Sequence, residues 1–84
     1  MNYIIRKSGV ECNSGDNHLG DFASIGECAD KCHQTPGCNF FVYGHGSREK
    51  KCYREQTETA DCSEGWQDNE YNFYEIITGI IFIT

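Results

Sequence analysis

The chain lacks the features of several common classes of protein. Lysine and arginine are scarce, at 7 against 13 acidic residues, and the net charge of −6 is opposite to what nucleic-acid binding needs. No apolar run approaches the ~20 residues of a membrane-spanning helix. Hydrophobic residues make up only 38% of the 84 residues, enough for one domain with a small core. The composition argues against a nucleic-acid-binding protein, a membrane span and a cytosolic enzyme.

Motifs that carry catalysis or bind metals are also missing. The sequence has no nucleophile elbow, HExxH, phosphate-binding loop or dinucleotide-binding fingerprint. It has no CxxC pair for zinc, and the acidic residues near its C-terminus lack the order of an EF-hand loop. We interpret His18, His33 and His45 as surface residues. The sequence therefore predicts no enzyme, no cofactor and no metal.

Cysteine is the residue that the chain has in excess, with six in 84 residues. An even number of cysteines in so short a chain is typical of a secreted domain whose disulfides compensate for a small core. We therefore expect a secreted, extracellular or cell-surface location. Residues 1–7 lack the apolar stretch of a secretory leader, so we expect a mature or excised domain.

One helix is well marked, over residues 25–34. Ser24 is a favourable N-cap and Glu27 follows three residues later, which is the pattern of a capping box. Pro36 must end the helix because proline cannot continue one. An apolar stripe runs along its successive turns and consists of Ile25, Cys28, Ala29 and Cys32.

The remainder of the chain is predicted to form short antiparallel strands. We expect Phe40 and Val42 to share one face of a strand with Cys38, while Phe41 and Tyr43 occupy the other face. The predicted strands are residues 38–43, their hairpin partner 51–55 across the loop 44–50, a third strand at 70–77 and a fourth at 3–6. One helix packed on such a sheet would give an α+β domain, an architecture that suits so small a core.

Geometry limits how the six cysteines pair. Cys28 and Cys32 lie one turn apart on the helix, so each is expected to reach off the helix. Cys32 can close a short loop to Cys38, and Cys28 can reach Cys52 on a neighbouring strand. The third bridge then follows by elimination. The predicted disulfides are Cys12–Cys62, Cys28–Cys52 and Cys32–Cys38.

The segment from Glu27 to Tyr43, followed by Lys51-Cys52-Tyr53, resembles the core of the PAN/apple domain family. That core combines a helix bearing Cys-x3-Cys, a third cysteine after a five-residue gap, an aromatic strand and a strand with a cysteine beside an aromatic residue. The close match covers residues 24–53, and a looser one extends over 12–77. The outermost bridge of apple domains often joins the chain ends, whereas Cys62 here follows soon after Cys52.

The resemblance implies an α+β domain over residues 1–77, with one helix packed on an antiparallel sheet. It also implies that the helix cysteines bridge toward the central strands. Modules of this family mediate protein–protein and protein–carbohydrate contacts and are not themselves enzymes. We therefore expect an extracellular, non-catalytic adhesion or recognition module whose partner is a protein or a glycan.

Two features are candidate binding elements. The loop over residues 44–51 presents positive side chains beside aromatic ones, a combination that suits an acidic glycan or an acidic protein face. The single tryptophan is interpreted as a packing residue, with sugar stacking as the alternative. The candidate ligand-binding residues are Tyr43, His45, Arg48, Lys50, Lys51, Tyr53 and Trp66.

The apolar tail, residues 78–84, lies beyond the part that resembles the family. A β-branched strand with no core to cover aggregates unless it pairs, either with residues 3–5 of its own chain or with the sheet edge of another copy. Residues 55–84 hold seven acids and no base, so they could also attract the basic stretch 48–54 of a second copy. The candidate assembly residues are Ile76, Ile77, Ile80, Ile81, Phe82 and Ile83.

This tail makes a structural subunit that assembles into a polymer or filament the alternative function. A secreted antagonist or toxin is a third possibility, because the size and cysteine content permit it, although no reactive loop is identifiable.

Overall fold

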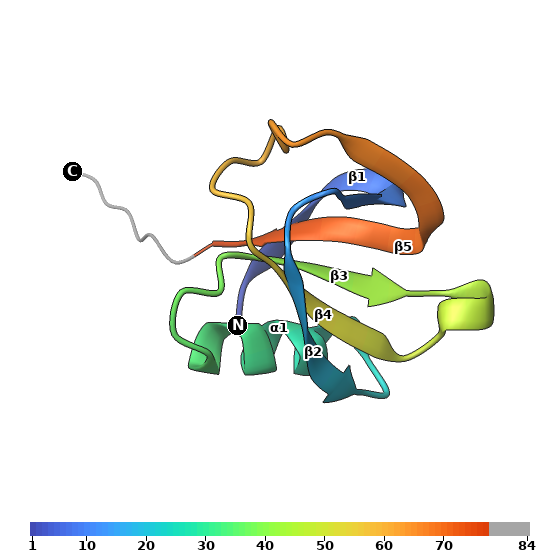
Figure 1. Cartoon of the computed structure of the whole chain (residues 1–84). Coiled ribbons are helices and arrows are strands. Elements are labelled where there is room, and N and C mark those ends of the chain that lie inside the picture. Colours follow the sequence, from blue (N-terminus) through green and yellow to red (C-terminus); the bar gives the residue numbers. More distant parts are fainter. Residues whose placement is uncertain (78–84) are drawn as a thin grey trace.

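The computed structural model describes residues 1–77. One α-helix lies across one face of a five-stranded antiparallel sheet, whose strands are ordered β1-β5-β3-β4-β2 (Figure 1). The α+β class predicted from the sequence is confirmed. The elements are β1 Tyr3–Cys12, β2 Asp16–Asp21, α1 Ile25–Gln34, β3 Phe40–Gly44, the 3-10 turn η1 Gly46–Arg48, β4 Lys51–Glu55 and β5 Trp66–Ile76.

Helix α1 begins and ends where the sequence predicts. The backbone N–H of Glu27 donates to Ser24 Oγ at 3.2 Å, and the N–H of Ala23 donates to Glu27 Oε1 at 3.0 Å. The first bond satisfies a donor that a helix N-terminus otherwise leaves unpaired, and the second ties the helix to the residue before its N-cap. The helix residues buried against the sheet are Cys28, Ala29 and Cys32.

β3 and β4 form the predicted hairpin, and β5 pairs with the other side of β3. Side chains alternate along β3, so Phe41 packs on the helix side of the sheet and Val42 packs on the opposite side. The prediction that Cys38 shares a face with Phe40 and Val42 is wrong. β3 begins only at Phe40, and Cys38 is drawn to the helix side by its bridge to Cys32.

The outer strands differ most from the sequence-based expectation. β1 and β5 pair over almost their whole length, well beyond the predicted ranges 3–6 and 70–77. Polar residues at their far ends and register shifts after Ile5 and Ser8 obscure the alternation that marks a strand. β2 was not predicted because aspartate, asparagine and glycine are poor strand formers, yet it pairs with β4 and completes the sheet.

Hydrophobic side chains pack on both faces of the sheet. The helix side centres on Phe41, and the opposite side centres on Phe73, beneath the curled ends of β1 and β5 and the loop 56–65 (Figure 1). Two disulfides fasten α1, and the third ties β1 to the loop. Their Cα–Cα distances are 5.7 Å for Cys28–Cys52, 5.2 Å for Cys32–Cys38 and 5.8 Å for Cys12–Cys62.

Candidate functional site

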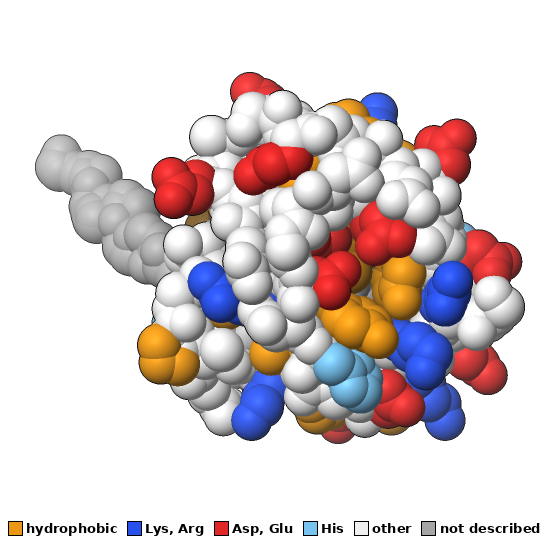
Figure 2. Space-filling model, viewed as in Figure 1, with side chains coloured by type: hydrophobic (Ala, Val, Ile, Leu, Met, Phe, Trp, Pro, Cys, Tyr) orange, Lys and Arg blue, Asp and Glu red, His pale blue; other side chains and the backbone are white. Residues whose placement is uncertain are grey.

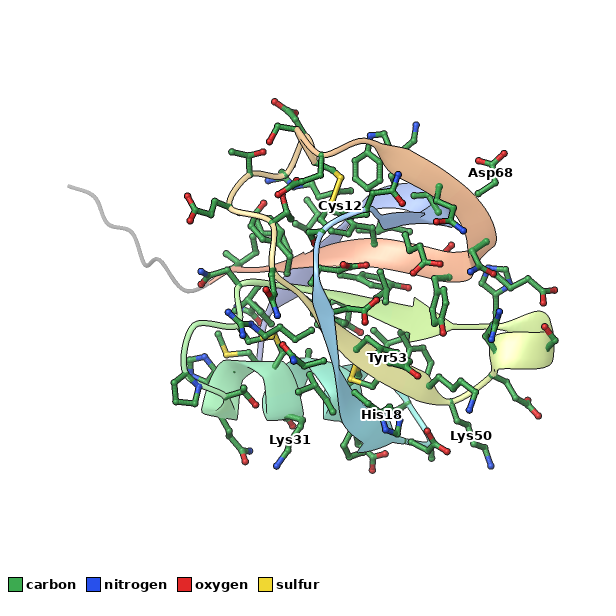
Figure 3. The ribbon with its side chains drawn as sticks, viewed as in Figure 1. Cys12, His18, Lys31, Lys50, Tyr53 and Asp68 are labelled. Atoms are coloured by element: carbon green, nitrogen blue, oxygen red, sulfur yellow. A yellow bond between two sulfur atoms is a disulfide. The ribbon has the colours of Figure 1, made fainter. Side chains whose placement is uncertain are left out.

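Three aromatic side chains form a continuous strip on the sheet face opposite the helix. The ring centroids of His18 and Tyr53 lie 4.9 Å apart, and Tyr71 meets Tyr53 edge-on at 6.1 Å. His18 is exposed, Tyr53 is half-buried and Tyr71 is buried, so the strip slopes from solvent into the core. Figure 2 shows hydrophobic side chains at the surface beside a histidine, and Figure 3 places His18 and Tyr53 next to each other. We call these three residues the aromatic strip.

The register of the sheet brings the strip together. His18 on β2 is directly opposite Tyr53 on β4, and cross-strand partners on one face are close enough for rings to stack. Tyr71 comes from β5, two residues before the central core residue Phe73, and therefore points to the same face. Burial raises the pKa of Tyr71, and the neighbouring Tyr53 adds to that effect. The strip is therefore made by three strands that are distant in sequence.

A positively charged loop borders the strip. Lys51 lies two residues before Tyr53 on β4 and shares its face. Arg48 is close enough to Tyr71 to influence the titration of its hydroxyl. Lys50, labelled in Figure 3, lies in the same loop and is exposed. Cations beside aromatic rings can hold a carboxylate or sulfate group while the rings contact an apolar surface.

Glu70 on β5 holds this loop in place. Its backbone carbonyl accepts a hydrogen bond from the N–H of His45 at 2.9 Å, and its carboxylate accepts bonds from both the N–H and the hydroxyl of Ser47. The bonds from Ser47 lower the pKa of Glu70 below its ordinary value. Gly46 has φ of +58°, a conformation that favours glycine, and a Cβ there would force the Glu70 carboxylate to move. The loop is therefore anchored to β5 before any partner binds.

Carboxyl groups border the strip on the side away from the loop. Glu55, at the end of β4, is 1% exposed, and ligand oxygens of Glu11, Asp16 and Glu55 all lie within 4.8 Å of one another. The N–H of Cys12 donates to Glu55 Oε2 at 3.2 Å, and the Ser14 hydroxyl donates to Oε1 at 3.0 Å. The Glu55 side chain therefore fastens the β1–β2 connection to the sheet.

Burial raises the pKa of Glu55 to about 8. The hydrogen bonds from Ser14 and Cys12 oppose this rise, while the negative charges of Asp16 and Glu11 add to it. Carboxylates are the ligand type that Ca²⁺ prefers. Both oxygens of Glu55 are nevertheless already bonded to the chain, and the other described cluster, Cys12, Cys62 and Glu64, contains a disulfide.

The predicted ligand-binding residues do not all lie together. Tyr53 belongs to the strip, and His45, Arg48, Lys50 and Lys51 lie on the loop or at the start of β4 beside it. Tyr43 instead packs on the helix side, where its hydroxyl donates to the carbonyl of Phe22 at 2.6 Å. Trp66 packs edge-on against Phe73 at 4.9 Å in the opposite-side core, beyond the strip. The structure therefore separates these two aromatic residues from the remainder.

The predicted assembly residues also differ among themselves. Ile76 is 6% exposed within β5 and packs in the helix-side core, whereas Ile77 is 37% exposed. The other predicted residues, Ile80, Ile81, Phe82 and Ile83, lie outside the described residues.

Sequence reasoning missed His18, Tyr71 and Glu55 as members of a site. The alternation of Tyr71 with Phe73 is a signal that could have placed Tyr71 on the face of Tyr53. His18 and Glu55 carry no such local signal, because only the pairing of β2 with β4 positions them.

Comparison with protein families gives one result, a match of the PAN domain to residues 3–77. The chain belongs to the PAN domain family. The match covers every strand and the helix that the structure describes. No match was found among curated proteins or among solved structures. The family resemblance drawn from the cysteine helix and the aromatic strand is therefore confirmed.

PAN domains are protein- and carbohydrate-binding modules of extracellular proteins and are generally not catalytic. The three disulfides of this PAN domain fit an extracellular setting. Its one α-helix within residues 1–77 is too short to cross a membrane.

Proposed function

We propose that this PAN domain is a non-catalytic extracellular recognition module that binds acidic glycans through the aromatic strip and the adjoining positive loop. The observation that carries the proposal is the unbroken series of ring contacts from His18 through Tyr53 to Tyr71, beside Arg48. Aromatic rings offer flat faces to the C–H surface of a sugar, and Arg or Lys supplies the charge partner for its carboxylate or sulfate.

The anchoring of the loop supports this proposal. Because Glu70 already orders the backbone at His45 and Ser47, less conformational entropy is lost when a ligand binds. The acidic residues Glu11 and Asp16 border the strip on its far side. They repel the anionic groups of a ligand and direct them toward the loop, which gives the glycan a preferred orientation.

A glycan array with the disulfide-bonded domain tests the proposal, with uronic-acid and sulfated glycans beside their neutral counterparts. We expect Arg48→Ala to weaken binding to the acidic glycans about tenfold, since one charge-assisted contact is worth ~1.5 kcal/mol or more. Tyr53→Leu keeps an apolar side chain in the strip but removes the ring, and is expected to weaken binding similarly.

Lys31→Ala is the matched control, because Lys31 is an exposed cation on α1, on the other side of the sheet (Figure 3). If Arg48→Ala and Lys31→Ala reduced binding equally, the glycans would be attracted by overall charge. That result would refute a site at the strip. Binding to protein ligands but to no glycan would replace the glycan with a protein partner.

A further inference from the structure

The described part of the chain exposes its large hydrophobic side chains at a single corner. This corner is the start of β1 and the end of β5, where Tyr3 is opposite Ile76 and the N–H of Ile77 donates to the carbonyl of Asn2 at 2.9 Å. The exposed fractions are 40% for Met1, 37% for Tyr3, 42% for Ile4, 46% for Ile5 and 37% for Ile77. An apolar patch of this kind on a small domain marks a contact surface.

The two edges of the sheet are protected to different degrees. β2 begins and ends with an aspartate and is interrupted by a register shift between His18 and Gly20, and both features discourage pairing with another strand. β1 has a described partner, β5, on one side only. Its stretch Tyr3–Ile5 has no charge, proline, glycine or register shift. Within residues 1–77, the unprotected edge of the sheet is therefore the N-terminal half of β1.

The sequence contains one segment suited to this edge. Residues 78–84, Thr-Gly-Ile-Ile-Phe-Ile-Thr, carry no charged side chain, and the last five, residues 80–84, are all β-branched or aromatic. They follow directly on Ile77, which is itself part of the exposed corner. A strand formed by these residues would cover the side chains that β1 leaves in solvent.

The same chain cannot easily supply that strand. β5 lies on one side of β1, so residues that follow Ile77 would have to cross β1 and reverse direction to reach its free edge. Two strand spacings amount to about 9.6 Å. The three steps from Ile77 to Ile80 span at most about 11 Å when fully extended. A same-chain strand that used all of residues 80–84 would therefore have almost no length left for the reversal, whereas another copy of the chain has no such constraint.

We infer that residues 78–84 of one copy pair as an added strand with the free edge of β1, at Tyr3–Ile5, in a second copy. Reciprocal exchange closes a two-fold dimer, and one-way addition extends a chain of copies. The contact uses the corner formed by β1 and β5 and does not involve the aromatic strip, so it holds whether or not the domain binds glycans.

Sedimentation velocity of residues 1–84 over a concentration series, with disulfides intact, tests the inference. Ile5→Lys disables the edge, and the double change Ile81→Asp/Phe82→Asp disables the tail within the same 84 residues. Gln67→Lys is the matched control, since it adds the same charge to an exposed position at the other end of the β1–β5 strand pair. If Ile5→Lys fails to fold, Ile4→Lys takes its place, since Ile4 is 42% exposed in the same stretch.

We expect the unchanged chain and Gln67→Lys to associate, and each disabled variant alone to associate at least about tenfold more weakly. A mixture of the edge variant and the tail variant should again associate, because one supplies an intact tail and the other an intact edge. A monomeric unchanged chain would overturn the inference. If the tail variant alone associated as strongly as the unchanged chain, pairing between two β1 edges would be indicated, and equally strong association of the edge variant alone would indicate clustering of tails. Either result, or failure of the mixture to associate, would overturn it as well.

Discussion

The buried carboxyl of Glu55 makes the stability of this PAN domain depend on pH in an unusual direction. In the unfolded chain its pKa is near 4.5, and in the folded domain burial raises it to about 8. The folded state therefore binds more protons than the unfolded state between these values. The stabilisation is fully present below about pH 4.5, decreases as pH rises and is lost by the time pH passes about 8.

The size of the effect follows from the two pKa values. At about 1.4 kcal/mol per pKa unit, the shift sets an upper limit of about 5 kcal/mol on the stability that is lost at alkaline pH. Relaxation around a partly hydrated carboxylate brings the expected loss to roughly 3–5 kcal/mol. That is a large share of the net stability of a small domain. Glu55→Gln removes the ionisation while its amide oxygen still accepts a bond from Cys12 or Ser14.

Urea denaturation from about pH 4 to pH 9 measures this difference, with Glu58→Gln as a control on an exposed glutamate. We expect Glu55→Gln to lie within about 1 kcal/mol of the unchanged protein at the acidic end and to be several kcal/mol more stable at the alkaline end. Parallel profiles for the two proteins, or a variant that is less stable at alkaline pH, would refute the assignment of the pH dependence to Glu55.

Two further predictions concern the covalent and local determinants of the fold. The Cys12–Cys62 bridge spans 50 residues, and replacing both cysteines by alanine should lower the free energy of unfolding by about 4 kcal/mol. The same change at the Cys32–Cys38 bridge, which spans six residues, should lower it by about 2 kcal/mol. Equal losses in denaturant titrations would contradict the loop-entropy argument. Ser24→Ala should cost about 1 kcal/mol through loss of the helix cap, measured by thermal unfolding, with Ser24→Gly expected to cost less.

The features that local sequence encodes were predicted well. The bounds of α1 follow from Ser24, Glu27 and Pro36, which act within one turn of the helix ends. The hairpin of β3 and β4 follows from aromatic and β-branched residues around a glycine-containing loop. The three disulfides of the structure are the same pairs that helix geometry and elimination select.

The candidate site, in contrast, exists only because of contacts between distant residues. His18 meets Tyr53 through a strand whose composition is typical of a loop, and Tyr71 joins them from the other end of the chain. Glu55 becomes buried only when the β1–β2 connection closes over it. Local propensity reflects the backbone conformations that a few neighbouring residues prefer, so it predicts the helix and the turns. It says nothing about which strands will lie side by side, and that pairing places the aromatic strip, the buried carboxyl and the open edge of β1.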